Sequence, residues 1–103
     1  MFISTTDIIP GRNYQIIGLV RGNVAYSKHF GRDIMAGFKN LAGGEIKSYT
    51  DMVSEARNIA EERMVQEAQR VGADAVIATR MMNDTVTEAT IEVVVYGTAV
   101  KFV

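Results

Sequence analysis

The sequence predicts an α+β domain in which two helices pack on a curved, largely antiparallel sheet, with the element order β-β-α-α-β-β. Three observations predict it. Two long stretches, one in each half of the chain, alternate or run continuously apolar, as strands do. Between them, apolar residues recur at helical spacing. The length of 103 residues suits one unit, so we expect residues 1–103 to form a single domain.

The first strands of the predicted sheet come from the start of the chain. Residues 2–3 form a short apolar segment, and a proline–glycine pair marks the connection over residues 7–13 as a turn. Residues 14–27 alternate as a long strand does. Gly18 and Gly22 lie inside it, and glycines in a strand mark a bend, a bulge or a close backbone approach. We therefore expect the sheet to curve there.

Two helices are predicted next. Apolar residues at intervals of four, four and three over residues 30–41 indicate the first, which ends at a pair of glycines. The second covers residues 49–71, with Ser48 or Thr50 as its expected N-cap and Gly72 as its expected left-handed end. Its apolar stripe consists of Tyr49, Met52, Val53, Ala56, Ile59, Ala60, Met64, Ala68 and Val71. One face of this helix should be buried and the other exposed.

Two further strands complete the predicted sheet. Strand character resumes over residues 73–82, and Asn83-Asp84 is expected to form the hairpin turn into a last strand over residues 91–103. This last strand is apolar on both faces. One face carries Ile91, Val93, Val95, Ala99 and Val103, and the other carries Val94, Tyr96, Val100 and Phe102.

The last strand also predicts assembly with other copies of the chain. Its thirteen residues would span about 43 Å when extended. A compact domain of this size has a radius of gyration near ~13 Å and a diameter of roughly 34 Å. The strand should therefore bend, at Gly97, or project from the subunit. Because a helix layer covers only one of its apolar faces, we expect a second copy to cover the other, in an oligomer with a curved or barrel-like centre.

Composition narrows the classes of function. Eleven basic and twelve acidic side chains leave a net charge of −1, which provides no long-range attraction for nucleic acid or for an anionic membrane. The chain has no cysteine, which excludes disulfides and thiolate sites and suits a reducing compartment. No signal peptide or apolar membrane span is evident. We therefore expect a cytoplasmic protein with neither nucleic acid nor membrane as a partner.

A series of short motifs covers nearly the whole chain. In order they are Ile9-Pro10-Gly11, Gly31-Arg32-Asp33, Gly43-Gly44-Glu45, Lys47 with Tyr49-Thr50, Glu55-Ala56-Arg57, Glu62-Arg63-Met64, Gly72-Ala73-Asp74-Ala75-Val76 and Tyr96-Gly97-Thr98-Ala99-Val100. In order and spacing these motifs resemble the YbjQ-like family of small bacterial and archaeal proteins. The resemblance implies an α+β subunit assembled into a homopentamer, and a family label of heavy-metal binding.

His29 and Asp33 are the candidate metal ligands. They lie four residues apart, on one face of the first predicted helix. Imidazole nitrogen and carboxylate oxygen are common ligands of zinc-like ions. His29 is the only histidine, so a site with several histidines would have to be built across subunits. The alternative is an ordinary surface histidine beside an acid, and the pattern of residues favours that alternative.

The methionines offer a second, weaker indication of metal binding. Thioether sulfur binds copper(I), and Met81-Met82 stand beside each other. Met52 and Met64, however, lie on the apolar stripe of the second helix, where methionine fills irregular space. Adjacent residues of a strand point to opposite faces. Core packing is therefore the better interpretation of the helical pair.

The sequence leaves three functions open, and we favour the first. It is a non-enzymatic homo-oligomer, most simply a pentamer, that binds a metal ion or small ligand at symmetric sites between subunits. The second is an enzyme whose active site lies between subunits and uses His29, Arg32 and Asp33. The third is a scaffold without a ligand. No cofactor is indicated by the sequence.

Overall fold

The computed structural model describes residues 1–27, 45–87 and 90–103, which form one helix on a four-stranded mixed sheet. The elements in chain order are β1 (Phe2–Ile3), β2 (Tyr14–Ser27), α2 (Glu45–Arg70), β3 (Ala75–Thr87) and β4 (Thr90–Phe102). The α+β class is thus confirmed. The first predicted helix, over residues 30–41, lies outside the described residues.

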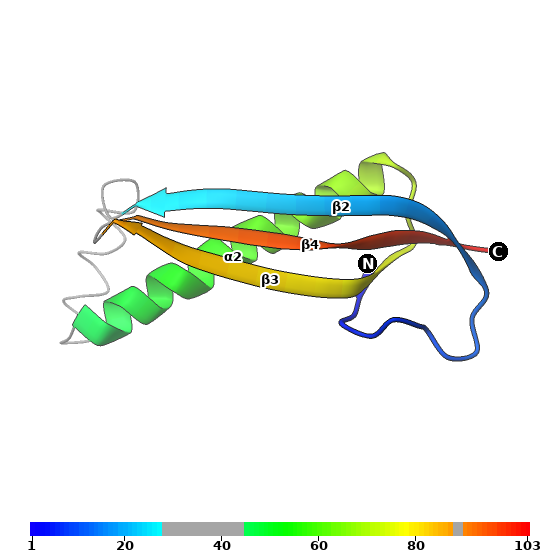
Figure 1. The fold of residues 1–103 in the computed structure, drawn as a ribbon, viewed down its shortest axis with the longest axis horizontal. Helices are drawn as coiled ribbons and strands as arrows, with labels where there is room; N and C mark the ends of the chain where they lie inside the picture. The colour runs from blue at the N-terminus through cyan, green and yellow to red at the C-terminus, as the bar shows by residue number, and fades with distance from the viewer. Residues whose placement is uncertain (28–44, 88–89) are drawn as a thin grey trace.

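The strand order is β1-β3-β4-β2, so that the last strand of the chain lies in the middle of the sheet (Figure 1). β4 pairs antiparallel with β2 on one side and with β3 on the other. β1 is short and pairs in parallel with the start of β3. The sheet is therefore largely antiparallel, as predicted, with one parallel pair at its edge.

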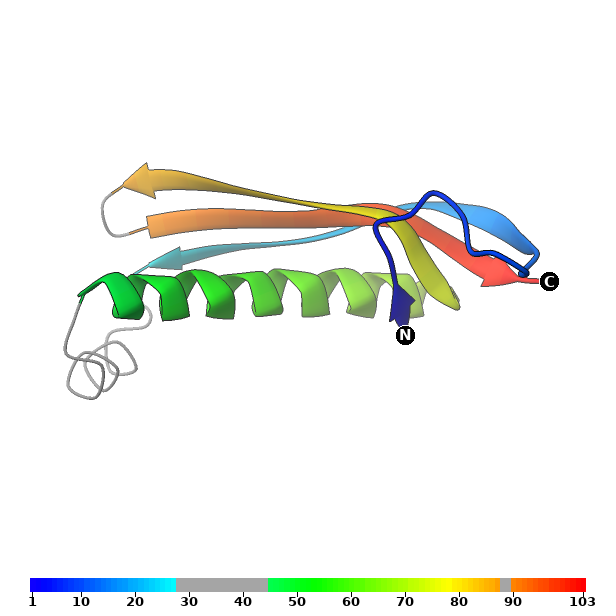
Figure 2. The ribbon, with the colours of Figure 1, turned by 90° about the horizontal axis from the view of Figure 1, so that it is seen from below.

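The helix α2 lies along one face of the sheet and leaves the opposite face uncovered (Figure 2). Its apolar stripe packs on the alternate residues of β2 and β4 that face it. The buried cluster between the two layers consists of Val20, Val24, Tyr26, Met52, Ala56, Ala60, Met64, Ala68, Val76, Ile91, Val93, Val95 and Ala99. Four of the five residues predicted for the first face of β4 belong to this cluster. The fifth, Val103, lies beyond β4 and is exposed.

Gly22 allows α2 to approach the sheet closely. A Cβ atom at this position would lie 2.1 Å from the Ala60 carbonyl oxygen and 2.4 Å from the Met64 backbone nitrogen. Real Cβ atoms do not come so close to backbone atoms, so glycine is the residue that lets helix and strand touch here. Gly18 has a different position, at a β-bulge where the pairing of β2 with β4 shifts between Ile16 and Gly18. Gly22 is thus the site of a close backbone approach and Gly18 the site of a bulge, which are two of the three roles that the sequence predicted for these glycines.

The end of α2 agrees with prediction, whereas its start does not. Gly72 has φ +80°, its N–H donates to the Gln69 carbonyl, and the Ala73 N–H donates to the Ala68 carbonyl. This pattern of two bonds is the Schellman end of a helix. The helix begins at Glu45, however, so the prediction that Ser48 or Thr50 caps it was wrong. Serine and threonine are common N-caps, but the sequence alone does not distinguish one that caps a helix from one inside it, because the difference lies in the backbone geometry.

The predicted turn at Asn83-Asp84 was also wrong. Both residues belong to β3, where Asn83 pairs with Val93 and Asp84 with Glu92. Pairing continues to Thr87, because the β-branched residues that follow Asp84 favour extended backbone. β3 therefore runs five residues beyond the predicted end at residue 82.

The predicted bend at Gly97 falls where the sheet is irregular. The pairing of β4 with β2 is continuous through Gly97, whereas its pairing with β3 is interrupted there by a bulge of Ala78 and Thr79, and Ala78 has φ 52°. A Cβ at Gly97 would lie 2.6 Å from Val76 Cγ1, so the glycine makes room for the bulged strand. The molecule is also elongated. The molecule measures 50 × 21 × 19 Å with a radius of gyration of 16.3 Å, larger than the compact value of about 13 Å expected for this length.

Candidate functional site

The predicted ligands His29 and Asp33, and also Arg32, lie outside the described residues. The predictions for methionine fall within them. Met52 and Met64 are fully buried beneath the sheet, which confirms core packing. Met81 and Met82 are exposed and lie on opposite faces of β3, since neighbouring residues of a strand alternate.

The uncovered face of the sheet carries the features that folding alone does not explain. We call it the open face. Residues paired directly across antiparallel strands share a face, so the pairings define it in rows. From the end nearest the chain termini outward, the rows across β2, β4 and β3 are Leu19, Thr98 and Ile77; Arg21, Tyr96 and Arg80; Asn23, Val94 and Met82; and Ala25, Glu92 and Asp84.

The segment before β2 covers one end of the open face. Ile9, Tyr14 and Phe102 pack there on the buried side chains of Ala75, Ile77 and Val100. Arg80 Nη1 donates to the Thr5 carbonyl at 3.0 Å, which ties the same segment to β3. The predicted second face of β4 is thus covered at its Val100 and Phe102 end by the protein's own chain.

Beyond that cover the open face carries accessible apolar residues among charged and polar ones. Leu19 is 66% exposed and Met82 is 59% exposed, while Val94 and Tyr96 between them are half-buried. Isolated exposed apolar residues are ordinary, but a contiguous apolar strip marks a contact surface. The prediction that β4 needs cover on two faces therefore applies to its outer half.

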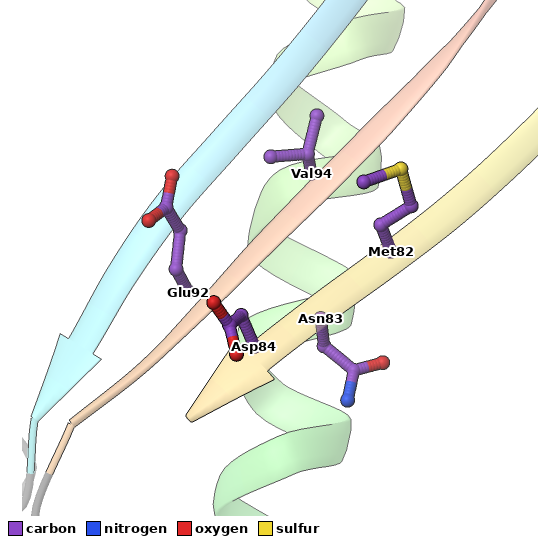
Figure 3. Close-up of a pocket in the computed structure, with 5 residues that line it drawn as sticks. All are labelled: Met82, Asn83, Asp84, Glu92 and Val94. Carbon is purple, nitrogen blue, oxygen red and sulfur yellow. The ribbon is translucent and has the colours of Figure 1, made fainter. Parts of the chain in front are cut away.

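A shallow hollow of about 190 Å³ lies at the outer end of the open face, lined by Met82, Asn83, Asp84, Glu92 and Val94 (Figure 3). Asp84 and Glu92 are direct partners across β3 and β4. Their carboxylates lie on the same side of the sheet, and the Asn83 side chain is turned away from them. Like charges placed directly opposite each other destabilise a sheet unless a cation lies near them. The chemistry of the hollow therefore suits a cationic group. The sequence analysis missed this acidic pair because it predicted a turn at Asn83-Asp84.

Two arginines lie at the edge of the sheet formed by β2. Arg63 of α2 reaches over to donate from Nη1 to the backbone carbonyl of Asn23 at 2.7 Å. Arg21 is exposed on the same strand, and its charge contributes to lowering the pKa of Glu67. The main cause of that lowered pKa is the side-chain hydrogen bond from Arg70, whose Nη2 lies 2.6 Å from Glu67 Oε1.

The described residues do not by themselves make a metal site. Across residues 1–27, 45–87 and 90–103, no three or more His, Cys, Asp or Glu side chains lie close enough together to hold an ion. The pair Asp84 and Glu92 offers two carboxylates, whereas zinc-like ions take three or four ligands, usually with nitrogen or sulfur among them. In the same part of the chain, no helix has the length and apolarity needed to cross a membrane.

Comparison with known proteins gives a consistent result. The model of the YbjQ family, described as "Putative heavy-metal-binding", matches residues 1–103. A "UPF0145 protein" of Thermotoga maritima is 58% identical over 102 residues, covering 98% of this chain and 96% of that protein. One of Vibrio campbellii is 52% identical over 102 residues, covering 98% of each.

The fold is shared with a solved structure. It is the crystal structure of a protein of unknown function from Pediococcus pentosaceus, placed by its description in the DUF74 family. It aligns with a TM-score of 0.69 and 18% identity, covering 100% of this chain and 98% of that one. None of the three relatives carries an enzymatic name.

Proposed function

The chain belongs to the YbjQ family, and from this premise we propose that it is a non-enzymatic homo-oligomer that binds a heavy-metal ion or a small ligand between its copies. The number of copies that we propose is five, arranged in a ring. Each copy is one domain over residues 1–103, and the absence of cysteine suits the cytoplasm as its location.

The observation that carries the proposal is the open face of the sheet. Helix α2 covers the other face, and the segment before β2 covers only the end near Val100. Leu19, Val94, Tyr96 and Met82 are left as an apolar strip along a molecule 50 Å long. Burying apolar surface is worth about 25 cal/mol per Å². Enclosing this strip within a ring of copies would therefore contribute free energy to assembly.

The metal part of the proposal rests on the family description and on the donor chemistry of two residues. His29 and Asp33 supply one imidazole and one carboxylate in each copy. A tetrahedral site needs more ligands than that, so a neighbouring copy must contribute. Because the chain has no cysteine, any bound metal is held by nitrogen and oxygen rather than by thiolate.

Two measurements test the proposal. Light scattering or native mass spectrometry at micromolar concentration should give a multiple of the 11.3 kDa subunit mass. Addition of Zn²⁺, Ni²⁺ or Cu²⁺ should raise the Tm of the wild-type protein, since a ligand that binds only the folded state stabilises it. His29→Ala should remove that rise, and Glu62→Gln, which changes an exposed acid of α2, should leave it intact. A monomer refutes the assembly, and a Tm that no metal changes refutes the metal site.

The two rival functions make different predictions. An enzyme with an active site between subunits would use His29, Arg32 and Asp33 together, so Arg32→Ala would abolish turnover without altering metal-induced stabilisation. A scaffold would show the oligomeric mass with no response to metals and no small molecule retained on purification. Mass spectrometry of whatever co-purifies with the native oligomer separates a ligand-binding protein from a scaffold.

A further inference from the structure

Among the described residues, the outer edge of β3 has no strand partner along half its length. β1 pairs with Ala75 and Val76, and backbone bonds from the N-terminal segment continue to Thr79. From Arg80 to Thr87 the strand pairs within the described chain only with β4, so its outer N–H and C=O groups face away from the sheet. Natural proteins rarely leave such an edge bare, because it accepts another strand.

Charges of opposite sign lie at the outer end of the β3 edge and along the β2 edge. On the β3 side, exposed Asp84 lies beside Glu92 at the outer end of the open face. On the β2 side, exposed Arg21 and Arg63 lie along the edge, and Arg63 occupies the Asn23 carbonyl. Strands β2 and β3 run in the same direction, since both are antiparallel to β4. Asp84 of one edge and Arg21 of the other are thus opposite in charge, and the strand directions suit parallel pairing.

We propose that the β3 edge of one copy docks against the β2 edge of a second copy, with the Asp84 carboxylate meeting the guanidinium group of Arg21. This contact joins two different surfaces, as a closed ring requires. The inference rests on the proposed assembly and names the surfaces through which it occurs. The cationic group that suits the acidic hollow is accordingly an arginine of the neighbouring subunit and not a metal ion.

Charge also selects the register of the pairing. Arg21 and Arg80 lie in the same row of one sheet. Docking without a shift would therefore place Arg80 beside Arg21 of the next copy, and like charges would repel. A shift of four residues, the separation of Arg80 and Asp84 along β3, places Asp84 beside Arg21 instead.

The same shift has the magnitude that barrel closure needs. Each copy contributes three long strands, spaced about 4.8 Å apart, and a shift of four residues is about 13 Å. The strands would then tilt by about 42° from the barrel axis, within the typical range of about 35–45°. This value depends on the shift per copy and not on the number of copies.

Arg21 is available for the contact. Glu67, whose pKa the charge of Arg21 helps to lower, is already held by Arg70 through two side-chain hydrogen bonds of 2.6 and 3.0 Å. A charge-assisted hydrogen bond to a carboxylate is roughly twice as strong as a neutral one. Arg63 donates to the Asn23 carbonyl at the same edge and would release it when the strands pair. Glu92 on β4 adds a second negative charge that draws the Arg21 guanidinium group toward Asp84.

Charge reversal tests the contact in solution. Asp84→Arg or Arg21→Asp alone should raise the dissociation constant of the oligomer at least tenfold, as measured by light scattering over a dilution series. The double variant reverses both charges and should return it to within about threefold of wild type. Glu62→Arg is the control and should leave it unchanged. If the wild-type protein is a monomer, the proposed assembly is refuted. If the wild-type protein is an oligomer and neither single reversal changes its dissociation constant, only this contact is refuted.

Cross-linking tests the register independently of stability. The chain has no cysteine, so Arg21→Cys combined with Asp84→Cys introduces the only two thiols. A disulfide requires Cα atoms within about 7 Å. Mild oxidation should therefore produce a ladder of covalent multimers on a non-reducing gel, and Arg21→Cys with Arg80→Cys should not. Far-UV circular dichroism verifies that each variant is folded. A ladder from the Arg80 pair, or none from the Asp84 pair, overturns the four-residue register.

Discussion

Replacing Gly22 by alanine should be among the most damaging single changes in this protein. The new Cβ would lie 2.1 Å from the Ala60 carbonyl oxygen, 2.4 Å from the Met64 nitrogen and 2.9 Å from the Arg63 carbonyl carbon. All three are backbone atoms of α2, so no side chain can rotate to relieve the overlap. The helix must move away from β2 by more than 1 Å, which is roughly the difference between 2.1 Å and an ordinary contact of 3.4 Å.

That movement would loosen the whole interface between helix and sheet. A gap of about 0.5–1 Å already forfeits a quarter to a half of the dispersion energy of each contact. Overpacking of a core typically costs about 1–3 kcal/mol. Because the displaced helix also carries Met52, Ala56 and Ala68 away from the sheet, we expect the free energy of unfolding to fall by at least about 3 kcal/mol, a large part of the ~5–15 kcal/mol of a typical domain.

Urea unfolding followed by circular dichroism, at a fixed subunit concentration, measures the loss. Gly72→Ala is the matched control, because a Cβ there meets nothing within 4 Å and the cost comes only from φ +80°. That cost should be about 1–2 kcal/mol. The reasoning would be refuted if Gly22→Ala destabilised the protein by no more than Gly72→Ala, since backbone contact would then not be the cause.

Three further outcomes are expected. Gly97→Ala should cost about 1–3 kcal/mol, because its Cβ would overlap Val76 Cγ1 at 2.6 Å; an unchanged urea midpoint would contradict a steric requirement for glycine there. Met64→Ala, at a fully buried site, should cost about 2–5 kcal/mol, whereas Met82→Ala should leave the stability of a dissociated subunit nearly unchanged; equal losses would contradict the assignment of their environments. Burial, with a smaller contribution from the charge of Glu55, raises the pKa of Tyr26 above its ordinary 10.0. As the pH rises, Tyr26 therefore loses its proton in the unfolded chain before it does so in the folded protein. Its contribution to the free energy of unfolding is complete below pH 10 and is lost as the pH rises further. A Tyr26→Phe variant should lack this loss of stability at alkaline pH.

The sequence predicted elements whose signals are local. Burial of Ile91, Val93, Val95 and Ala99 on one face of β4 follows from alternation, and the end of α2 at Gly72 follows from a residue preference of the backbone. The need to cover the other face of β4 was also evident, because no helix can reach both faces of one strand.

The parts that sequence could not supply depend on which strands meet. Asn83-Asp84 has the composition of a turn, and only pairing with Val93 and Glu92 holds it extended. The acidic pair Asp84 and Glu92 was missed for the same reason. A glycine inside a strand, such as Gly22, predicts that some backbone approaches closely, but only the structure shows that the approaching element is α2. The candidate ligands His29 and Asp33 remain a prediction.

The position of β4 has a consequence for how the chain acquires its structure. β4 follows β2, α2 and β3 in sequence, yet it is the strand that joins β2 to β3. During synthesis, which runs from the N-terminus, β4, the strand with which β2 pairs in the described part of the chain, is made last. Helix α2 can form early, but the surface on which it packs is completed only when residues separated by most of the chain length come together. Such pairing slows folding and prolongs the exposure of apolar strands. Nascent chains of this protein should therefore depend on protection from aggregation until β4 is inserted.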